Sequence, residues 1–133
     1  MSIRTVTVHV SNFRIFRLIQ SMYVAKWTPE KGWDAGSLLP YGPLSVMPSA
    51  QVLNYGQAIF EGMKAQESTK GRIVLFRPDK NAERFKAGAE RLSMPPVPED
   101  QFVAAVQSLV SANKGWVRRS LGWCVGGESS PLG

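Results

Sequence analysis

Apolar and polar residues follow strand-like patterns in two parts of the chain. Residues 22–27, Met-Tyr-Val-Ala-Lys-Trp, are rich in aromatic and β-branched side chains, and residues 28–32, Thr-Pro-Glu-Lys-Gly, follow as a turn. Residues 72–76, Arg-Ile-Val-Leu-Phe, give the clearest strand signal, and Thr69-Lys70-Gly71 before them is typical of a hairpin turn. The pattern therefore predicts two strands with a turn beside each.

The sequence between these strands is less decisive. Residues 36–48 contain Pro40, Gly42, Pro43 and Pro48, which permit only short extended pieces such as residues 44–47. Residues 59–66 fit either a strand or a short helix on local pattern alone. The middle of the chain is thus left without an assigned element.

Two helices are expected in the second half of the chain. Pro78 and Asp79 suit the first turn of a helix that ends at Ser93, with a buried stripe of Ala82, Phe85, Ala89 and Leu92. The prolines at 95, 96 and 98 separate it from a second helix, opened by Pro98-Glu99-Asp100 and closed by Lys114-Gly115. The apolar face of the second helix is Phe102, Val106, Leu109 and Val110. Strands first and helices after them predict an α+β domain.

Both ends of the chain differ from this middle part. The first 29 residues hold no acidic residue but include Arg4, Arg14 and Arg17, as in transit peptides of mitochondria or chloroplasts; without targeting the protein would be cytoplasmic. Alternatively, residues 5–8 and 13–16 alternate like β-structure. Residues 118–133 show neither helical nor strand period and predict a disordered tail.

Composition and charge exclude several classes of protein. The 133 residues carry 16 Lys+Arg against 10 Asp+Glu, a net charge of +6 that would suit an anionic partner. The longest basic run is Arg118-Arg119, and no aromatic-interleaved basic stripe is present, so we expect no nucleic-acid binding. No stretch approaches the roughly 20 apolar residues that span a bilayer, so we expect no membrane segment.

The one cysteine and the one histidine also limit the possible sites. Cys124 alone cannot form a disulfide within the chain, which fits a reducing compartment. Cys124 and His9 are too few to hold a structural zinc ion, so we expect no metal site.

A longer pattern covers residues 22–117. It includes Asn54-Tyr55-Gly56-Gln57-Ala58-Ile59-Phe60-Glu61-Gly62-Met63-Lys64-Ala65, together with residues 40–44, 75–85, 88–95 and 101–117. In order and spacing, these segments resemble the branched-chain amino acid aminotransferases. D-amino acid aminotransferases and aminodeoxychorismate lyases tend to carry a Gly-Asp-Gly-like turn where this chain has Tyr55-Gly56-Gln57, so the resemblance is to the branched-chain group.

The resemblance implies a fold and a cofactor. Residues 22–117 would form the small N-terminal domain of the D-amino acid aminotransferase-like enzymes of fold type IV, preceded by a divergent segment, 1–21, and followed by a divergent tail, 118–133. Such enzymes are homodimers that hold pyridoxal 5′-phosphate between a small and a large domain. They exchange amino groups between leucine, isoleucine or valine and 2-oxoglutarate, in amino-acid biosynthesis or breakdown.

The resemblance also assigns three site residues. Arg84 matches the arginine that binds the cofactor phosphate, a role that suits a planar guanidinium. Tyr55 and Phe60 match aromatic residues that line the substrate side-chain pocket. From local sequence alone, Arg84 would belong to a solvated face with Lys80 and Arg91, and both aromatics would be ordinary core residues.

The isolated chain is expected to be inactive as an aminotransferase. Lys64 is not the lysine that holds the cofactor as a Schiff base in the family; that residue lies downstream, so no catalytic residue is expected in these 133 residues. After Trp116-Val117 the family continues with a Pro-rich segment and a further strand, where this chain has Arg118-Arg119-Ser120. The alternative function is therefore a non-catalytic truncated form or a fragment of a gene.

Overall fold

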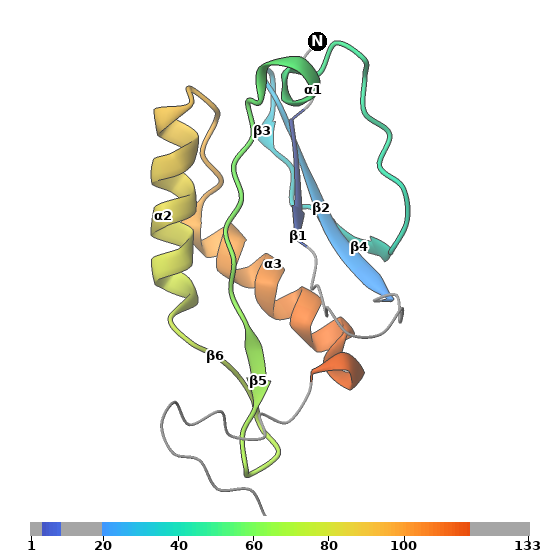
Figure 1. Ribbon diagram of the computed structural model, residues 1–133, viewed down its shortest axis with the longest axis vertical. Helices are drawn as coiled ribbons and strands as arrows, with labels where there is room; N and C mark the ends of the chain where they lie inside the picture. The colour runs from blue at the N-terminus through green and yellow to red at the C-terminus, as the bar shows by residue number, and fades with distance from the viewer. Residues whose placement is uncertain (1–3, 9–19, 118–133) are drawn as a thin grey trace, which may run out of the picture.

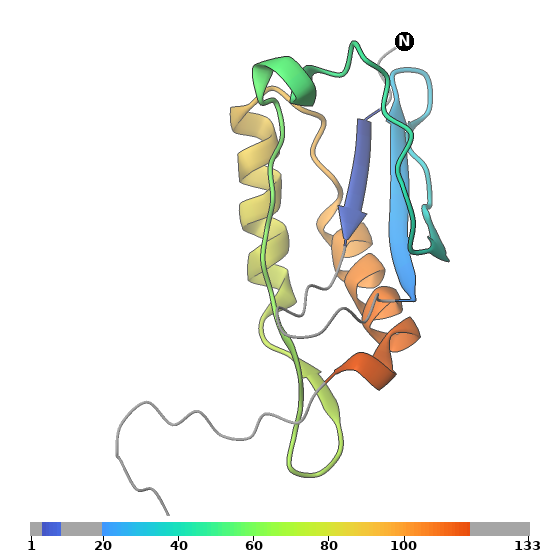
Figure 2. The same cartoon turned by 45° about the vertical axis from the view of Figure 1, so that its right-hand side comes forward.

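The computed structural model describes residues 4–8 and 20–117 of the chain (Figure 1). One four-stranded sheet lies on one side, and α3 lies between this sheet and α2 in both views (Figures 1 and 2). In chain order the elements are β1 Arg4–Val8, β2 Ser21–Thr28, β3 Gly32–Trp33, β4 Ser37–Pro40, α1 Gln51–Tyr55, β5 Ala65–Glu67, β6 Ile73–Leu75, α2 Pro78–Arg91, α3 Glu99–Ala112 and a 3₁₀ turn Lys114–Trp116. The expected mixed α and β architecture is confirmed.

Strand β2 is the centre of the four-stranded sheet. It pairs antiparallel with β1, from Arg4 opposite Trp27 to Val8 opposite Tyr23. It also pairs with β3 and β4, which follow it in the chain. The strand predicted at residues 22–27 is confirmed, and so is the strand interpretation of residues 5–8. Residues 13–16 and the tail 118–133 lie outside the described residues.

The second sheet is the β5–β6 hairpin. Ala65, Gln66 and Glu67 pair with Leu75, Val74 and Ile73, and Gly71 in the turn has a φ of +73° that favours glycine. The predicted hairpin is confirmed, although its second strand is shorter than residues 72–76. Residues 44–47 form no strand, and the nearby strand is β4, whose partner is β2.

Two helices lie where the sequence predicted them, but α2 ends at Arg91 and not at Ser93, because Ser93 has a φ of +52° that is incompatible with a continuing helix. α2 begins at Pro78 with Asp79 in its first turn, and α3 begins at Glu99 with Asp100 beside it. The apolar face expected for α3 is buried throughout. In α2 the prediction was wrong for Leu92, which is 39% exposed because the helix ends at Arg91 and Leu92 is its C-cap.

The main core forms where α3 meets α2 and the extended chain. Its buried members are Ala82, Val97, Phe102, Val106 and Val110. Phe85 of α2 packs on Phe102 of α3 with ring centroids 5.2 Å apart. Aromatic rings of both helices and branched side chains of α3 therefore fill the space between the helices.

Asn113 connects the end of α3 to the start of β2. The residue is 2% exposed, and its Oδ1 accepts hydrogen bonds from the amides of Gln20 and Ser21 at 3.1 and 3.2 Å. Its Nδ2 donates to the carbonyl oxygens of Ser21 and Leu109 at 3.1 and 2.9 Å. All four hydrogen-bonding positions of the amide are used, which fixes the sheet against the helix.

Gly88 provides a test of this packing. A Cβ added there would lie 3.6 Å from Cγ2 of Ile59, an ordinary contact, and the glycine is inside α2. We expect Gly88→Ala to raise the free energy of unfolding by about 0.5–1 kcal/mol, because alanine is the better helix former. Urea denaturation followed by tryptophan fluorescence measures it. The contrasting control is Gly36→Ala, which should destabilise, since Gly36 has a φ of +66° and its added Cβ would overlap the Tyr23 ring. Destabilisation by Gly88→Ala would contradict the packing described.

Candidate functional site

An extended segment, residues 57–64, lies along α2 (Figure 2). At one end Gln57 Nε2 donates a hydrogen bond of 2.8 Å to the carbonyl oxygen of Leu92. Further along, Ile59 approaches Gly88. Near the other end Asn81 Nδ2 donates a hydrogen bond of 3.0 Å to the carbonyl oxygen of Gly62. The segment is therefore attached to the helix over most of its length.

The exposure of this segment alternates residue by residue. From Gln57 to Glu67 the odd-numbered residues are half-buried against the domain, and the even-numbered residues are exposed. Phe60 is 96% exposed. Such alternation is typical of a strand with one face covered, yet residues 57–64 belong to no sheet. The strand or short helix expected at residues 59–66 is therefore confirmed only from Ala65 onward.

The segment brings Glu61 to Arg84. Arg84 Nε donates to Oε2 of Glu61 at 2.9 Å, and Nη2 donates to Oε1 at 3.2 Å. Oε1 also accepts a hydrogen bond of 3.0 Å from the Gly62 amide. The Arg84 side chain is 60% exposed and that of Glu61 only 15%. This is a two-bond ion pair whose carboxylate is shielded and whose guanidinium faces outward.

The hydrogen bonds from Arg84 lower the pKa of Glu61, although partial desolvation of the carboxylate opposes them. A carboxylate with a lowered pKa contributes its stabilisation above its unfolded-state pKa and loses it as the pH falls through the folded-state pKa. The pair is therefore charged throughout the neutral range, and Glu61 holds Arg84 in one orientation there.

Arg84 retains donors that could bind an anion. Among the described residues, no hydrogen bond uses Nη1, and Glu61 takes only the Nε–Nη2 edge of the guanidinium. The planar group can thus present its Nη1–Nη2 edge to two oxygen atoms of a phosphate group. The neighbouring cation on the helix, Lys80, pairs with Glu83. The donor set suits the phosphate of a cofactor.

The two predicted aromatic residues are both on the surface. Tyr55 is the last residue of α1 and is 83% exposed, and Phe60 is still more exposed. The alternative that they are ordinary core residues is therefore wrong, because Tyr55 ends a helix with no buried residue and Phe60 faces away from α2. Arg84 is 60% exposed, as the alternative of a solvated helix face predicts, and it is also paired with Glu61.

Sequence reasoning missed Glu61. Its pairing with Arg84 joins residues 23 apart in the sequence, so no local pattern indicates it. Lys64 is exposed and lies on the same outward side of the segment as Phe60.

Large apolar side chains are exposed over a long part of the chain. Those more than 40% exposed between residues 38 and 60 are Leu38, Tyr41, Leu44, Val46, Met47, Val52, Leu53, Tyr55 and Phe60. Exposed apolar surface on this scale is unusual for a soluble monomer and marks surfaces that contact other protein or ligand.

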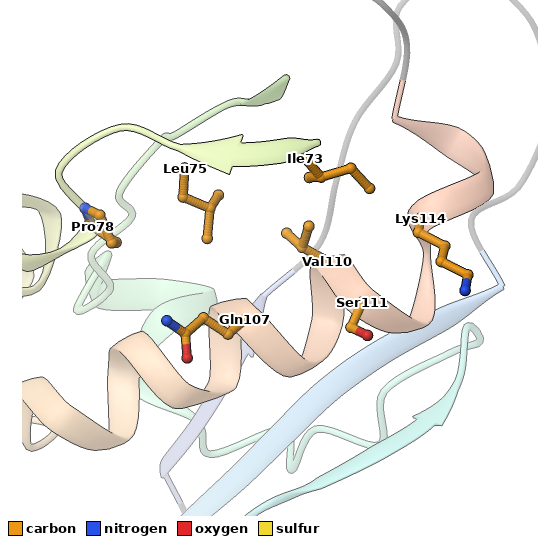
Figure 3. Close-up of a pocket in the computed structure, with 7 residues that line it drawn as sticks. All are labelled: Ile73, Leu75, Pro78, Gln107, Val110, Ser111 and Lys114. Carbon is orange, nitrogen blue, oxygen red and sulfur yellow. The ribbon is translucent and has the colours of Figure 1, made fainter. Parts of the chain in front are cut away.

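A separate pocket lies between the hairpin and α3 (Figure 3). Its volume is about 440 Å³, and it is lined by Ile73, Leu75, Pro78, Gln107, Val110, Ser111 and Lys114. None of the predicted site residues lines it. The ion pair, and not this pocket, is the candidate site.

Two further observations concern metal ions and membranes. Within residues 4–8 and 20–117, no group of three or more His, Cys, Asp or Glu residues is arranged to hold a metal ion. In the same part of the chain, no helix is long and apolar enough to cross a membrane.

Comparison with known proteins gives related sequences. The chain is 53% identical over 96 residues to a chloroplastic branched-chain-amino-acid aminotransferase of Arabidopsis thaliana, covering 72% of the chain and 25% of the relative. It is 47% identical over 96 residues to a probable branched-chain-amino-acid aminotransferase of Streptomyces coelicolor, covering 72% and 26%. It is 48% identical over 96 residues to a methionine aminotransferase of Arabidopsis thaliana, covering 72% and 27%. The chain thus spans about a quarter of the length of these relatives. No protein-family model matches it.

Proposed function

We propose that this chain, a relative of the branched-chain amino acid aminotransferases that matches part of their length, forms the cofactor-phosphate side of such an enzyme. Residues 22–117 would be the small domain of the fold type IV enzymes. Arg84 would bind the phosphate of pyridoxal 5′-phosphate, and the cofactor would supply the electron sink for amino-group transfer.

The observation that carries this proposal is the arrangement of Arg84. Its Nε and Nη2 donate to Glu61, while Nη1 and the second hydrogen of Nη2 make no hydrogen bond within the described residues. An exposed ion pair adds little to stability, and this one leaves three N–H donors of Arg84 available to an anion. A phosphate group fits the donors that remain.

Tyr55 and Phe60 would line the substrate pocket once the rest of the enzyme covers them. Their exposure supports this role, because large aromatic side chains that are exposed in one domain usually mark a surface that a ligand or another domain covers. The substrates would be leucine, isoleucine or valine with 2-oxoglutarate. One relative is a methionine aminotransferase, so the pocket would also suit an unbranched apolar side chain.

The exposed apolar residues between 38 and 60 would face the remainder of the subunit and the second subunit of a homodimer. A chloroplast location is one candidate, because several relatives are chloroplastic.

A chimera tests the proposal. The chain is joined to the remaining three quarters of the Streptomyces coelicolor relative, and Arg84 is changed to Ala. We expect the dissociation constant for pyridoxal 5′-phosphate to rise by the equivalent of about 2 kcal/mol, the scale of a hydrogen bond to a charged group. Absorbance titration of the cofactor measures it.

The matched control is Arg91→Ala, since Arg91 is an exposed arginine two turns further along α2. This variant should bind the cofactor as the parent does. Equal cofactor affinity of the Arg84→Ala variant and the parent would refute the proposed role of Arg84.

A further inference from the structure

We infer that Glu61 is a positioning residue, which holds the Arg84 guanidinium by one edge so that the other edge is presented to a phosphate group. The inference rests on the proposed function, because it deepens the role given there to Arg84. Glu61 itself does not contact the anion in this arrangement.

The division of the guanidinium into two edges carries the inference. Glu61 accepts from Nε and Nη2, at 2.9 and 3.2 Å, which is the side-on geometry of a planar carboxylate against a planar guanidinium. This geometry fixes the plane of the guanidinium as well as its position. The edge formed by Nη1 and Nη2 points away from the carboxylate and is compatible with binding a second anion at the same time.

Glu61 is suited to act as the fixed member of the pair. Its side chain is 15% exposed, and its Oε1 is also bound by the Gly62 amide at 3.0 Å. The backbone on either side is attached to α2 through Gln57 and Asn81. Arg84, at 60% exposed, is a long side chain that would otherwise lose rotamer freedom when it bound an anion. The contact with Glu61 removes that freedom beforehand, which favours phosphate binding.

Glu61 also has an opposing effect, because its negative charge repels a phosphate group nearby. The chain offers a residue that separates the two effects. Glu83 precedes Arg84 on α2 and carries the same charge, but it pairs with Lys80 and makes no hydrogen bond to Arg84. Removing the charge of Glu83 changes the local potential without releasing the guanidinium.

The experiment compares the full 133-residue chain with its Glu61→Gln and Glu83→Gln variants. Each is titrated with pyridoxine 5′-phosphate, which keeps the phosphate ester of the cofactor but has no aldehyde to react with lysines, and the ³¹P chemical shift is followed. We expect Glu61→Gln to weaken binding about fivefold, because the freed arginine must be ordered again. Glu83→Gln should leave binding unchanged or make it slightly tighter. Unchanged or tighter binding by Glu61→Gln would overturn the inference, since repulsion would then outweigh positioning.

Two further measurements separate this inference from the proposed function. The Nε–H resonance of Arg84 should be resolved in the parent chain and in Glu83→Gln, and should move upfield and exchange faster in Glu61→Gln. An unmoved resonance in Glu61→Gln would show that Glu61 does not hold Arg84. The second measurement is the same phosphate titration of Arg84→Ala. If Arg84→Ala weakens binding and Glu61→Gln does not, only the positioning role is wrong; if Arg84→Ala has no effect, the proposed phosphate site and the positioning role both fail.

Discussion

Replacing Asn113 with Ala is expected to lower the free energy of unfolding by about 3–4 kcal/mol. The substitution removes four hydrogen bonds at once and leaves the amides of Gln20 and Ser21 without their side-chain acceptor. A buried polar group left unpaired costs about 1–3 kcal/mol, and Asn113 is almost fully buried. Urea denaturation followed by tryptophan fluorescence and by circular dichroism measures the change.

Two variants sharpen this prediction. Ser111→Ala, an exposed change two residues away, should alter stability by less than about 0.5 kcal/mol. Asn113→Asp keeps the shape but places a carboxylate oxygen against the carbonyl oxygens of Ser21 and Leu109, so it should destabilise at neutral pH. Stability should recover as the pH falls, because a protonated carboxyl group can donate one hydrogen bond. An Asn113→Ala protein as stable as the parent would show that the described network contributes nothing.

The helices were predictable because their signals are local. Pro78 and the Pro98-Glu99-Asp100 sequence mark helix starts, and the apolar spacing from Phe102 to Val110 is a property of one contiguous segment. Both were found in the structure. The failure at Leu92 has a local cause too, since one residue past a helix end no longer lies on the buried face.

The middle of the chain was not predictable, because distant contacts determine it. β4 is a strand because its residues pair with β2, and residues 57–64 are extended because they lie on α2, which follows them in the chain. The local sequence of Ser37–Pro40 does not indicate that β2 is its partner.

The candidate site was predictable in part. Arg84, Tyr55 and Phe60 were identified from a resemblance to the family, and their roles remain proposals. Glu61 was missed because an ion pair across 23 residues leaves no periodic signal, and the outward direction of Phe60 follows only from the attachment of the segment to α2. The local sequence favoured core aromatics, whereas the structure leaves them exposed.

Phe60 and Ile59 are adjacent residues with opposite environments, and they allow a matched test of the proposed substrate pocket. Phe60 is 96% exposed, while Ile59 is half-buried and approaches Gly88. Changing Ile59 to Ala in the chimera should lower the free energy of unfolding by about 1–2 kcal/mol, less than a fully buried isoleucine would. It should leave kcat/KM for leucine within about threefold of the parent, since the side chain faces the helix.

Phe60→Ala should give the reverse result. We expect little change in the stability of this domain, because the ring has almost no contact to lose within it. In the chimera, kcat/KM for leucine should fall roughly 100-fold, which corresponds to a loss of about 3 kcal/mol of transition-state stabilisation. The reason is that the ring would form an apolar wall against the substrate side chain. Phe60→Leu should recover most of the activity, since an apolar surface of similar reach is restored. Steady-state kinetics with leucine and 2-oxoglutarate measure both variants. If Phe60→Ala retains full activity, or if it lowers the free energy of unfolding as much as Ile59→Ala does, then Phe60 is not a wall of the substrate pocket.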